Sequence, residues 1–451
     1  MIKLPQPVTR LIGILEASGH EAFVVGGCVR DSLMDRKPND WDICTSARPE
    51  EMKACFSDFP VIETGLKHGT LTVLMDHRPF EITTYRIDGD YSDGRRPDQV
   101  TFTSSLQADL ARRDFTINAM AYHPAAGLVD PFGGQNDLRH RIIQCVGTAA
   151  ERFEEDALRI MRAVRFASQL EFAIEEKTSA ALDARLPLLD RVSPERIRIE
   201  FDKLLRGPDA MKVLAQYRQV IAHIIPEAEA MFDLDQRNPY HAYTVWDHTL
   251  HAVSHVKNTT VLKLAAFFHD IGKPGSMTIG EDGRGHFYKH ERLSEELTEQ
   301  IMRRLKYDNA TRITVTILIH NHGIVFRPDP RQARRLLSKL GEERLRLLIE
   351  LEYADVKSQN PIYTEERVAN IQAFSQIVDQ VLEAEQCFSL RHMKLQGKDL
   401  LSMGLPQGPK IGRVLNALLE QVVEGRLPNE KKALTHAAKA MIASDRSRPD
   451  S

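Results

Sequence analysis

Two aspartates one residue apart are the first candidate chemical groups in the chain. Asp40 and Asp42 follow a Gly26-Gly27 turn that ends the apolar run at residues 23–25. In extended backbone, residues i and i+2 point to the same face, so we expect the two carboxylates to lie side by side. Such charges repel each other unless a cation lies between them, and Mg²⁺ favours one or two carboxylates together with substrate phosphates. The pattern predicts a metal-dependent phosphoryl or nucleotidyl transfer site with Asp40 and Asp42 as catalytic ligands.

The glycine turn and a nearby arginine form a candidate phosphate site. Gly27 has no Cβ, so backbone N–H groups can approach a triphosphate, and the charge of Arg30 is placed to pair with phosphate oxygens. Glu81 is a third carboxylate, and the sequence leaves open whether it touches metal or supports the aspartates indirectly. Alone, a Gly-Gly pair usually marks a turn and Asp-x-Asp a solvated strand end. The order and close spacing of these residues favour a site.

A second cluster occupies residues 109–121. Arg113 and Asn118 are candidates for contacts with the phosphate, sugar or base of a nucleotide. The alternative is a helix with a capping aspartate and surface arginines.

A third cluster occupies residues 155–166, where an arginine recurs at every third position. Around a helix, Arg159, Arg162 and Arg165 drift by about 60° per step, which predicts one broad basic face. Asp156 and Arg159 together offer one acceptor and a fork of donors, a match to the Watson–Crick edge of a base. The alternative for this pair is a helix salt bridge worth about 0.2–0.5 kcal/mol.

The elements that must position these groups change along the chain. Amphipathic spacing predicts an opening helix over residues 8–15, and helix and strand signals alternate up to residue 145. The expected strands are 23–25, 70–74 and 80–85. From residue 149 helical periodicity dominates, with a short exception at 283–288. We therefore expect an α+β fold, with a small mixed or antiparallel-sheet head followed by an all-helical remainder.

Composition bounds the class of protein. The 451 residues are 42% hydrophobic and 27% charged, which is typical of a globular protein. No apolar run approaches the roughly 18 residues of a membrane span, the N-terminus lacks a signal peptide, and five cysteines are scattered without metal-ligand spacing. We expect a cytoplasmic protein with reduced thiols and no membrane partner. The net charge of −3 argues against a globally basic nucleic-acid binder but allows local basic surfaces.

A second constellation lies in the helical half. Its members are His248, His269, Asp270, His290 and Asp355, with His320 and His322 as weaker candidates. Imidazoles and carboxylates of this kind can gather around one metal or two, and they suit Mn, Fe, Ni, Co or Zn. The alternative for each histidine alone is a surface or capping residue.

The three head clusters, in this order, resemble a known enzyme family. The motifs are Gly-Gly-x-Val-Arg-Asp…Asp-x-Asp, then Arg-Arg-Asp-Phe-Thr-Ile-Asn-Ala-Met-Ala, then Glu-Asp-x-Leu-Arg…Arg-x-x-Arg-Phe. Over about the first 200 residues they look like the bacterial class II tRNA nucleotidyltransferases, the CCA-adding enzymes, whose superfamily includes bacterial poly(A) polymerases.

The resemblance implies a mechanism and a set of partners. Asp40 and Asp42 would bind the catalytic Mg²⁺, and tRNA, CTP and ATP would be the partners. The positions implied to contact the incoming nucleotide are Gly27, Arg30, Arg113, Asp156, Arg159, Arg162 and Arg165. The implied fold is a five-stranded head followed by a helical neck, body and tail. Residues 88–98, with Arg95 and Arg96, resemble the flexible loop that helps the switch from C to A addition, and its full length argues against a CC-only enzyme.

The histidine pattern resembles the HD-domain metal phosphohydrolases, which are fused to some CCA-adding enzymes. It implies a second divalent transition metal and a phosphatase or cyclic phosphodiesterase activity. The expected domains are a nucleotidyltransferase head (1–145), a neck for base selection and RNA binding (146–230), an HD body (231–370) and a tRNA-binding tail (371–451).

Basic clusters are candidates for RNA contacts, although any one of them alone is usually a solvated helix face. One lies in the tail at Lys431, Lys432 and Lys439, and residues 397–413 place a Gly408-Pro409 start before a helix, where a phosphate can bind.

The sequence thus predicts template-independent addition of CCA to the 3′ end of tRNA. One alternative is a poly(A) polymerase or A-adding enzyme with the same head. Another is a protein that is mainly an HD phosphohydrolase with a nucleotide-binding head. The oligomeric state and any coupling between the two sites stay open.

Overall fold

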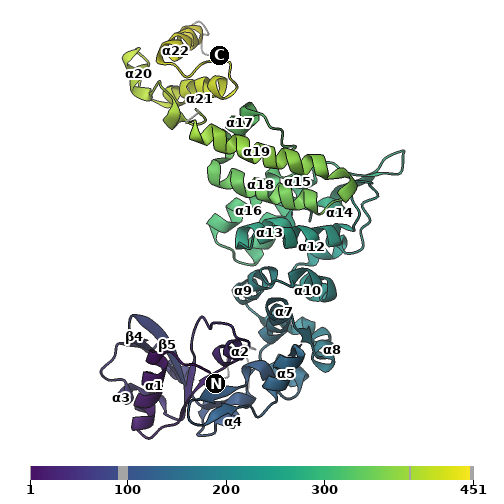
Figure 1. The fold of residues 1–451 in the computed structure, drawn as a ribbon. Helices are drawn as coiled ribbons and strands as arrows, with labels where there is room; N and C mark the ends of the chain where they lie inside the picture. Colours follow the sequence, from purple (N-terminus) through teal and green to yellow (C-terminus); the bar gives the residue numbers. More distant parts are fainter. Residues whose placement is uncertain (1, 90–99, 385–386, 447–451) are drawn as a thin grey trace. The chain divides into compact units, whose positions relative to one another are not determined.

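The computed structural model describes residues 2–89, 100–384 and 387–446 (Figure 1). The chain forms two compact units. The first comprises residues 1–229 with 304–307, and the second comprises residues 230–303 with 308–451. The two are described separately below, and the expected domain borders at residues 145 and 370 stay predictions.

The head of the first unit is built on one seven-stranded sheet. Its strand order is β3 (Val61–Ile62), β4 (Thr70–Met75), β5 (Arg78–Thr84), β2 (Ile43–Thr45), β1 (Ala22–Val25), β8 (Ala121–His123) and β9 (Gly127–Val129). β2 pairs with β5 in parallel and all other pairs are antiparallel. The expectation of a mixed sheet is confirmed. The implied number of five strands is wrong, because β3 and β9, of two and three residues, extend the sheet at its two edges.

One face of this sheet is closed by helices. The expected opening helix is α1 (Gln6–Ala17), which buries Leu11 and Leu15 in the same cluster as Val24 and Ile43. β4 alternates buried and half-buried residues along its length, the period-two pattern of a strand with one face in the core. The other helices of the head are α2 (Gly27–Leu33), α3 (Pro49–Cys55), α4 (Leu106–Ala111) and α5 (Gly134–His140).

The remainder of the first unit is helical. It contains α6 (Ala149–Glu155), α7 (Leu158–Leu170), α8 (Glu176–Arg185), α9 (Pro194–Leu205), α10 (Ala210–Gln216) and α11 (Arg218–Ile224). α7 is the central helix and packs closely against α9. Two short parallel strands, β10 (Ile142–Ile143) and β11 (Ala173–Ile174), flank α7.

The second unit is helical apart from one hairpin. Its helices are α12 (Val245–His255), α13 (Thr260–Phe268), α14 (Lys273–Ser276), α15 (His290–Arg304), α16 (Asn309–Asn321), α17 (Pro330–Leu340), α18 (Glu342–Lys357), α19 (Glu365–Glu383), α20 (Gly397–Ser402), α21 (Pro409–Val423) and α22 (Lys431–Arg446). The hairpin of β12 (Met277–Ile279) and β13 (Gly285–Phe287) accounts for the expected break in helical periodicity. α12 packs on α13 and α18, and α13 packs on α16 and α18. Within the described residues, no helix is long and apolar enough to cross a membrane.

Candidate functional site

The two head aspartates lie at the entrance to the central strand β2. Both aspartates lie just before the strand, because β2 begins at Ile43, the residue after Asp42. The backbone N–H of Val25 donates to the carbonyl of Asp42 at 3.0 Å. Because β2 lies between β1 and β5, the sheet fixes the backbone from which the Asp42 carboxylate projects.

Burial and neighbouring charge disturb the Asp42 carboxyl strongly. Burial, the charge of Asp40 and the charge of Glu81 raise the pKa of Asp42 to about 6, although Arg113 acts in the opposite direction. Asp40 and Glu81 thus each disfavour the charged form of Asp42, and the neighbouring carboxylates of Asp40 and Asp42 offer the hard oxygen atoms that Mg²⁺ prefers. The residues present therefore fit a Mg²⁺ site, and the influence of Glu81 on Asp42 places it in the same electrostatic cluster.

The glycine turn requires glycine at its first position. Gly26 precedes α2 with a φ of +80°, a conformation that L side chains rarely adopt. A Cβ at Gly26 would also lie 3.0 Å from Arg113 Nη1. Gly27 is an ordinary helical residue, and a Cβ there would lie 3.7 Å from Arg30 Nη2. The turn thus depends on Gly26 more than on the predicted Gly27.

A hydrogen-bonded chain joins the three clusters that the sequence singled out. Arg30 Nη1 donates to Asn118 Oδ1 at 2.7 Å, and Asn118 Nδ2 donates to Asp114 Oδ1 at 3.0 Å. Arg162 Nε donates to Asp114 Oδ2 at 2.8 Å. Burial raises the pKa of Asp114, but the Arg162 charge and the Asn118 hydrogen bond outweigh it and hold that pKa far below its usual range. Asp114 is the central acceptor of this hydrogen-bonded chain. It was not among the predicted site residues, because in the sequence it directly follows Arg112 and Arg113 and nothing local shows its distant partner Arg162.

One aromatic ring lies among three of the arginines. The Cζ atom of Arg165 lies 3.4 Å from the Phe166 ring centroid, and those of Arg30 and Arg162 lie 5.1 Å and 5.4 Å away. The edge of the same ring contacts Phe115, with the centroids 5.8 Å apart. Cation–π contact of this kind orients guanidinium groups in addition to their ion pairs.

The predicted broad basic face of α7 is wrong. Each of its arginines has a carboxylate partner: Arg159 with Glu155 at 2.6 Å, Arg162 with Asp114, and Arg165 with Glu200 at 2.7 Å. Arg159 and Arg165 are buried, so their charges are neutralised inside the unit.

Asp156 and Arg159, the predicted acceptor–donor pair, each have other hydrogen-bond partners in this structure. Asp156 lies between α6 and α7, and its Oδ2 accepts from Arg196 Nη2 at 2.8 Å. Arg159 donates to the carbonyls of Arg112 and Arg152, at 2.8 Å and 3.1 Å. The predicted loop residues Arg95 and Arg96 lie outside the described residues.

The second unit brings the predicted histidines and aspartates into one cluster. His248 from α12 and His269 after α13 place their Nε2 atoms 3.2 Å apart, and both face Asp270 Oδ2, at 3.4 Å and 3.2 Å. Asp355 Oδ1, from α18, lies 2.9 Å from His248 Nε2. His290 Nε2, at the start of α15, lies 3.4 Å from the other carboxylate oxygen, Oδ1, of Asp270.

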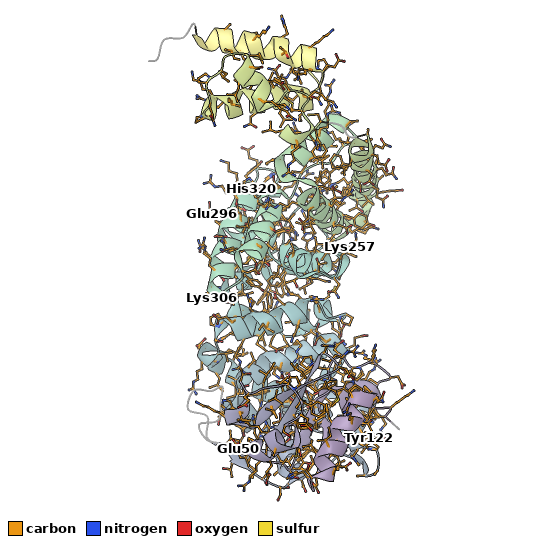
Figure 2. The ribbon with its side chains drawn as sticks, turned by 90° about the vertical axis from the view of Figure 1, so that its left-hand side faces the viewer. Glu50, Tyr122, Lys257, Glu296, Lys306 and His320 are labelled. Atoms are coloured by element: carbon orange, nitrogen blue, oxygen red, sulfur yellow. The ribbon has the colours of Figure 1, made fainter. Side chains whose placement is uncertain are left out.

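His322 joins this cluster, whereas His320 does not. His322 Nε2 lies 3.1 Å from His290 Nε2 and 3.7 Å from Asp270 Oδ1. His320, labelled in Figure 2, is exposed on α16. Its Nδ1 atom bonds the Glu295 carboxylate at 2.6 Å. We call His248, His269, Asp270, His290, His322 and Asp355 the histidine–aspartate cluster.

Backbone carbonyls fix the orientation of all four imidazoles. The Nδ1 atoms of His248, His269 and His290 bond the carbonyls of Ser358, Ala266 and Phe287 at 3.1, 2.8 and 2.8 Å, and His322 Nδ1 bonds the carbonyl of Ile319. This contact fixes the tautomer and leaves each Nε2 lone pair for a metal. Two groups, His248–His269–Asp270 and Asp270–His290–His322, have ligand atoms within 4.8 Å of one another and share the Asp270 carboxylate. The residues present fit one cation or two, and Asp270 could contribute ligand atoms to either group.

Neighbouring carboxylates favour the charged form of one imidazole in this cluster, that of His269. Burial opposes the charge on His269, but Asp270 and Asp355 raise the pKa of that imidazole to about 10. Lys273 Nζ also lies 2.7 Å from Asp270 Oδ2. A divalent cation would displace the imidazole protons, because only neutral imidazole ligates metal.

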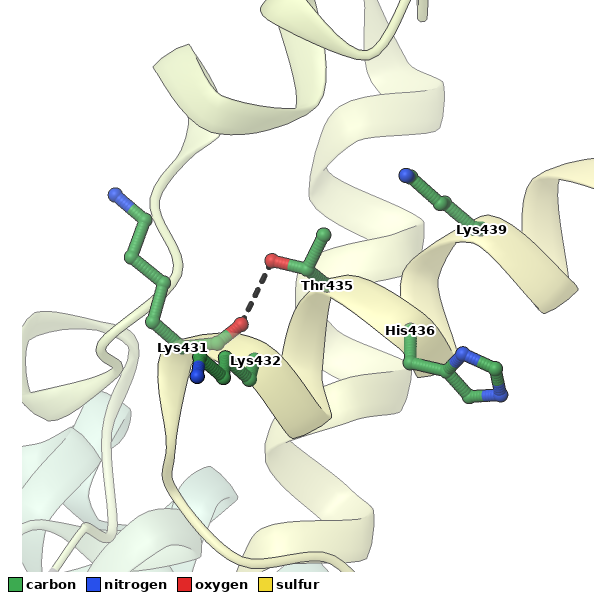
Figure 3. A pocket seen from close by; sticks show the side chains of 5 residues that line it. All are labelled: Lys431, Lys432, Thr435, His436 and Lys439. Carbon is green, nitrogen blue, oxygen red and sulfur yellow. Dashed lines mark hydrogen bonds between the residues drawn. The ribbon is translucent and has the colours of Figure 1, made fainter.

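The tail carries an exposed lysine surface on α22. Figure 3 shows Lys431, Lys432, Thr435, His436 and Lys439 around one shallow pocket, with the Thr435 hydroxyl donating to the Lys431 carbonyl at 2.7 Å. Lys431 also pairs with Asp399 at 2.9 Å. The predicted helix start after Gly408 is confirmed by α21.

Comparison with known proteins agrees with both halves of this chain. Residues 22–144 match the poly A polymerase head domain, residues 171–232 match the probable RNA and SrmB-binding site of polymerase A, and residues 287–438 match the putative tRNA nucleotidyltransferase domain 2. The CCA-adding enzyme of Enterococcus faecalis is 34% identical over 442 residues, which cover 96% of this chain and 94% of that protein. The chain belongs to the CCA-adding enzymes. It is therefore a nucleotidyltransferase.

Other members of the family show the same relation. The CCA-adding enzyme of Lactobacillus helveticus is 36% identical over 436 residues, covering 96% of this chain and 97% of that protein. The structure of the Bacillus stearothermophilus CCA-adding enzyme in complex with CTP matches with a TM-score of 0.73 at 28% identity, over 99% of this chain and 100% of that chain. A Thermotoga maritima CCA-adding enzyme complexed with tRNA shares the fold, with a TM-score of 0.58 at 20% identity over 98% of this chain and 97% of that chain.

Proposed function

We propose that this protein adds CCA to the 3′ end of tRNA, using CTP and then ATP. The carrying observation is the Asp40–Asp42–Glu81 carboxyl set beside Arg113 and the glycine turn. The tRNA 3′-hydroxyl attacks the α-phosphate of the nucleotide, and pyrophosphate leaves. Mg²⁺ held by Asp40 and Asp42 would lower the pKa of that hydroxyl and neutralise charge on the phosphates.

The chain's own residues bind and orient the nucleotide in this proposal. Arg30 and Arg113 face the turn and pair with phosphate oxygens, and Asn118 holds Arg30 in place through its 2.7 Å hydrogen bond. Asp156 and Arg159 read the base after exchanging their present partners for it, and Arg162 and Arg165 support them from α7. The existing ion pairs set an energetic threshold that only a matching base exceeds.

The test is single-nucleotide product analysis. The purified protein is incubated with Mg²⁺ and tRNA ending at the discriminator base, with CTP, ATP or both. Growth by two nucleotides with CTP and by three with both supports CCA addition. Long tails from ATP alone would assign a poly(A) polymerase, and a single ATP step only on tRNA ending in CC would assign an A-adding enzyme.

A second activity is favoured by the histidine–aspartate cluster. We propose that the cluster binds two divalent transition metals, with Asp270 between them, and hydrolyses phosphate esters in the manner of HD-domain enzymes. Metal in this site would supply an activated water for attack on phosphorus. Lys273, 2.7 Å from Asp270, adds a fixed positive charge for the substrate phosphate.

Reciprocal variants separate the two activities. Asp270→Asn should remove bound metal, measured by elemental analysis, and phosphatase activity, while CTP addition persists. Asp42→Asn should do the reverse. A protein whose phosphatase activity survives Asp270→Asn would contradict the second proposal and leave the first intact.

The proposed tRNA partner also needs a backbone-binding surface. The tail lysines of α22 are exposed and lie around a shallow pocket, a geometry suited to phosphate contacts that carry no base information (Figure 3).

A further inference from the structure

A pocket of about 280 Å³ opens over the histidine–aspartate cluster. Its floor includes Asp270, His290, His322 and Asp355, and its wall includes the end of the β12–β13 hairpin. The pocket is near the lower end of the usual size for ligand sites, which suits one small phosphate ester.

The wall of this pocket carries an exposed aromatic pair. The rings of His286 and Tyr288 stack with centroids 5.4 Å apart and an interplanar angle of 8°, and both side chains line the pocket. Tyr288 is 70% exposed, so one face of the pair is open to a ligand. A flat ring kept in place by a second ring, beside a candidate phosphate-cleaving centre, is the geometry that stacks a nucleobase.

Backbone constraints fix the pair relative to the cluster. Lys289, between Tyr288 and His290, has a φ of +59°, a strained conformation for a lysine. The imidazole of His290 is anchored to the carbonyl of Phe287 at 2.8 Å. The hairpin itself is seated by Gly285, whose N–H donates to the Arg237 carbonyl at 3.0 Å. The aromatic pair and His290, a candidate ligand, therefore belong to one hydrogen-bonded local turn.

Two positively charged side chains, Lys273 and Arg367, also line the pocket, and Lys273 Nζ lies 5.2 Å from the ring centroid of Phe287 in the hairpin. Lys273 is buried and bonded to Gln236 Oε1 at 2.8 Å, and Arg367 is half-buried and bonded to Gln359. Both line the pocket, so a phosphate between them lies over the cluster while a base reaches the Tyr288 ring.

We propose that the pocket selects phosphate esters that carry a nucleobase, with Tyr288, backed by His286, as the specificity-determining platform. This inference rests on the proposed hydrolytic function of the cluster. A stacked base should tighten binding by about 5- to 150-fold relative to a phosphate ester without a ring.

The test compares two probes on the metal-loaded full-length protein, adenosine 3′-monophosphate and glycerol phosphate. Binding is measured by calorimetry, and hydrolysis by phosphate release. Tyr288→Ala should weaken adenosine monophosphate binding and raise its KM by roughly tenfold, with kcat little changed and both values for glycerol phosphate unaltered. Tyr288→Phe keeps the ring and should behave as the wild type.

Tyr243 provides a matched control. Its ring also contacts a histidine, His251, with centroids 4.3 Å apart and an interplanar angle of 30°, but Tyr243 does not line the pocket. Tyr243→Ala should leave both probes unaffected. Equal loss of both probes in Tyr288→Ala, or no loss of either, would overturn the platform.

The two proposals fail differently. If the protein hydrolyses both esters without preference, the platform is wrong and the hydrolytic function stands. If neither ester is hydrolysed but Tyr288→Ala still weakens nucleotide binding selectively, the platform stands as a binding site and the hydrolytic function is wrong.

Discussion

Replacing Asp114 tests whether the hydrogen-bonded chain that it shares with Asn118 and Arg162 supports nucleotide binding as well as stability. Asp114→Asn conserves shape but replaces one carboxylate oxygen with an N–H₂ group. Because the remaining oxygen serves Asn118 and the Phe115 N–H, the new donor faces the donors of Arg162. Removing one partner of a fully buried ion pair costs about 3–5 kcal/mol.

The expected cost here is smaller. The Arg162 side chain is 33% exposed, so water recovers part of the lost interaction, and we expect about 2 kcal/mol. If the network positions Arg30 and Asn118 for the nucleotide, the same loss appears as a roughly 30-fold fall in kcat/KM for CTP. Urea unfolding gives the first quantity and steady-state CTP addition the second.

The sign of the pH dependence provides a further check. The pKa of Asp114 is lowered in the folded protein, so the stabilisation by its carboxylate is complete at pH values above the pKa of an unfolded aspartate, about 3.9. This stabilisation is lost as the pH falls further, toward the pKa of the folded protein. The stability difference between wild type and variant should therefore be full at pH 7 and shrink below about pH 4.

A matched control separates the two effects. Asp137 is another buried aspartate of the head, and it accepts from the Thr116 hydroxyl at 2.5 Å. It is not a member of the hydrogen-bonded chain that joins Asp114 to Arg30 and Arg162. Asp137→Asn should lower stability with little change in the KM for CTP. The reasoning is refuted if Asp114→Asn loses stability and yet retains the wild-type KM.

Three other predictions follow from the geometry. Because the pKa of Asp42 is raised, the folded protein holds a proton between about pH 4 and 6 that the unfolded chain has released, and the free energy of unfolding should fall as pH rises through that window. Mg²⁺ should therefore raise Tm more at pH 7.5 than at pH 5. Asp42→Asn should abolish this difference. Gly26→Ala should cost about 1–2 kcal/mol in thermal unfolding because of its positive φ, whereas Gly13→Ala, in α1 with open space around it, should be neutral or stabilising. Replacing Lys432 and Lys439 by Glu should weaken tRNA binding and flatten its salt dependence without changing the thermal midpoint, and an unchanged salt slope would exclude this surface.

Spacing rules predicted much of the fold and the residue sets of both sites. α1, β4 and β5 were predictable because each buries one face at its own period, whereas β1 was predictable as a short, mostly buried apolar run. The alternation of helix and strand signals predicted the mixed fold of the head. The edge strands β3 and β9 were not, because two or three residues carry no measurable periodicity.

The side-chain partners of the site residues could not be predicted from local sequence patterns. The arginines of α7 appeared as a basic face because their carboxylate partners, Asp114 and Glu200, lie 48 and 35 residues away in sequence. His322 and His320 were indistinguishable by spacing, and only tertiary packing places one in the cluster and the other at the surface.

The ring of Phe166 has a consequence for how this site can change over evolution. Arg30, Arg162 and Arg165 come from two helices, yet all three rest against this one side chain. Losing the ring would remove a contact of all three arginines in a single mutational step. We therefore expect substitutions at these four positions to be epistatic: a lineage that replaces Phe166 would have to adjust its arginines together, and single-site exchange between homologues should fail where block exchange succeeds.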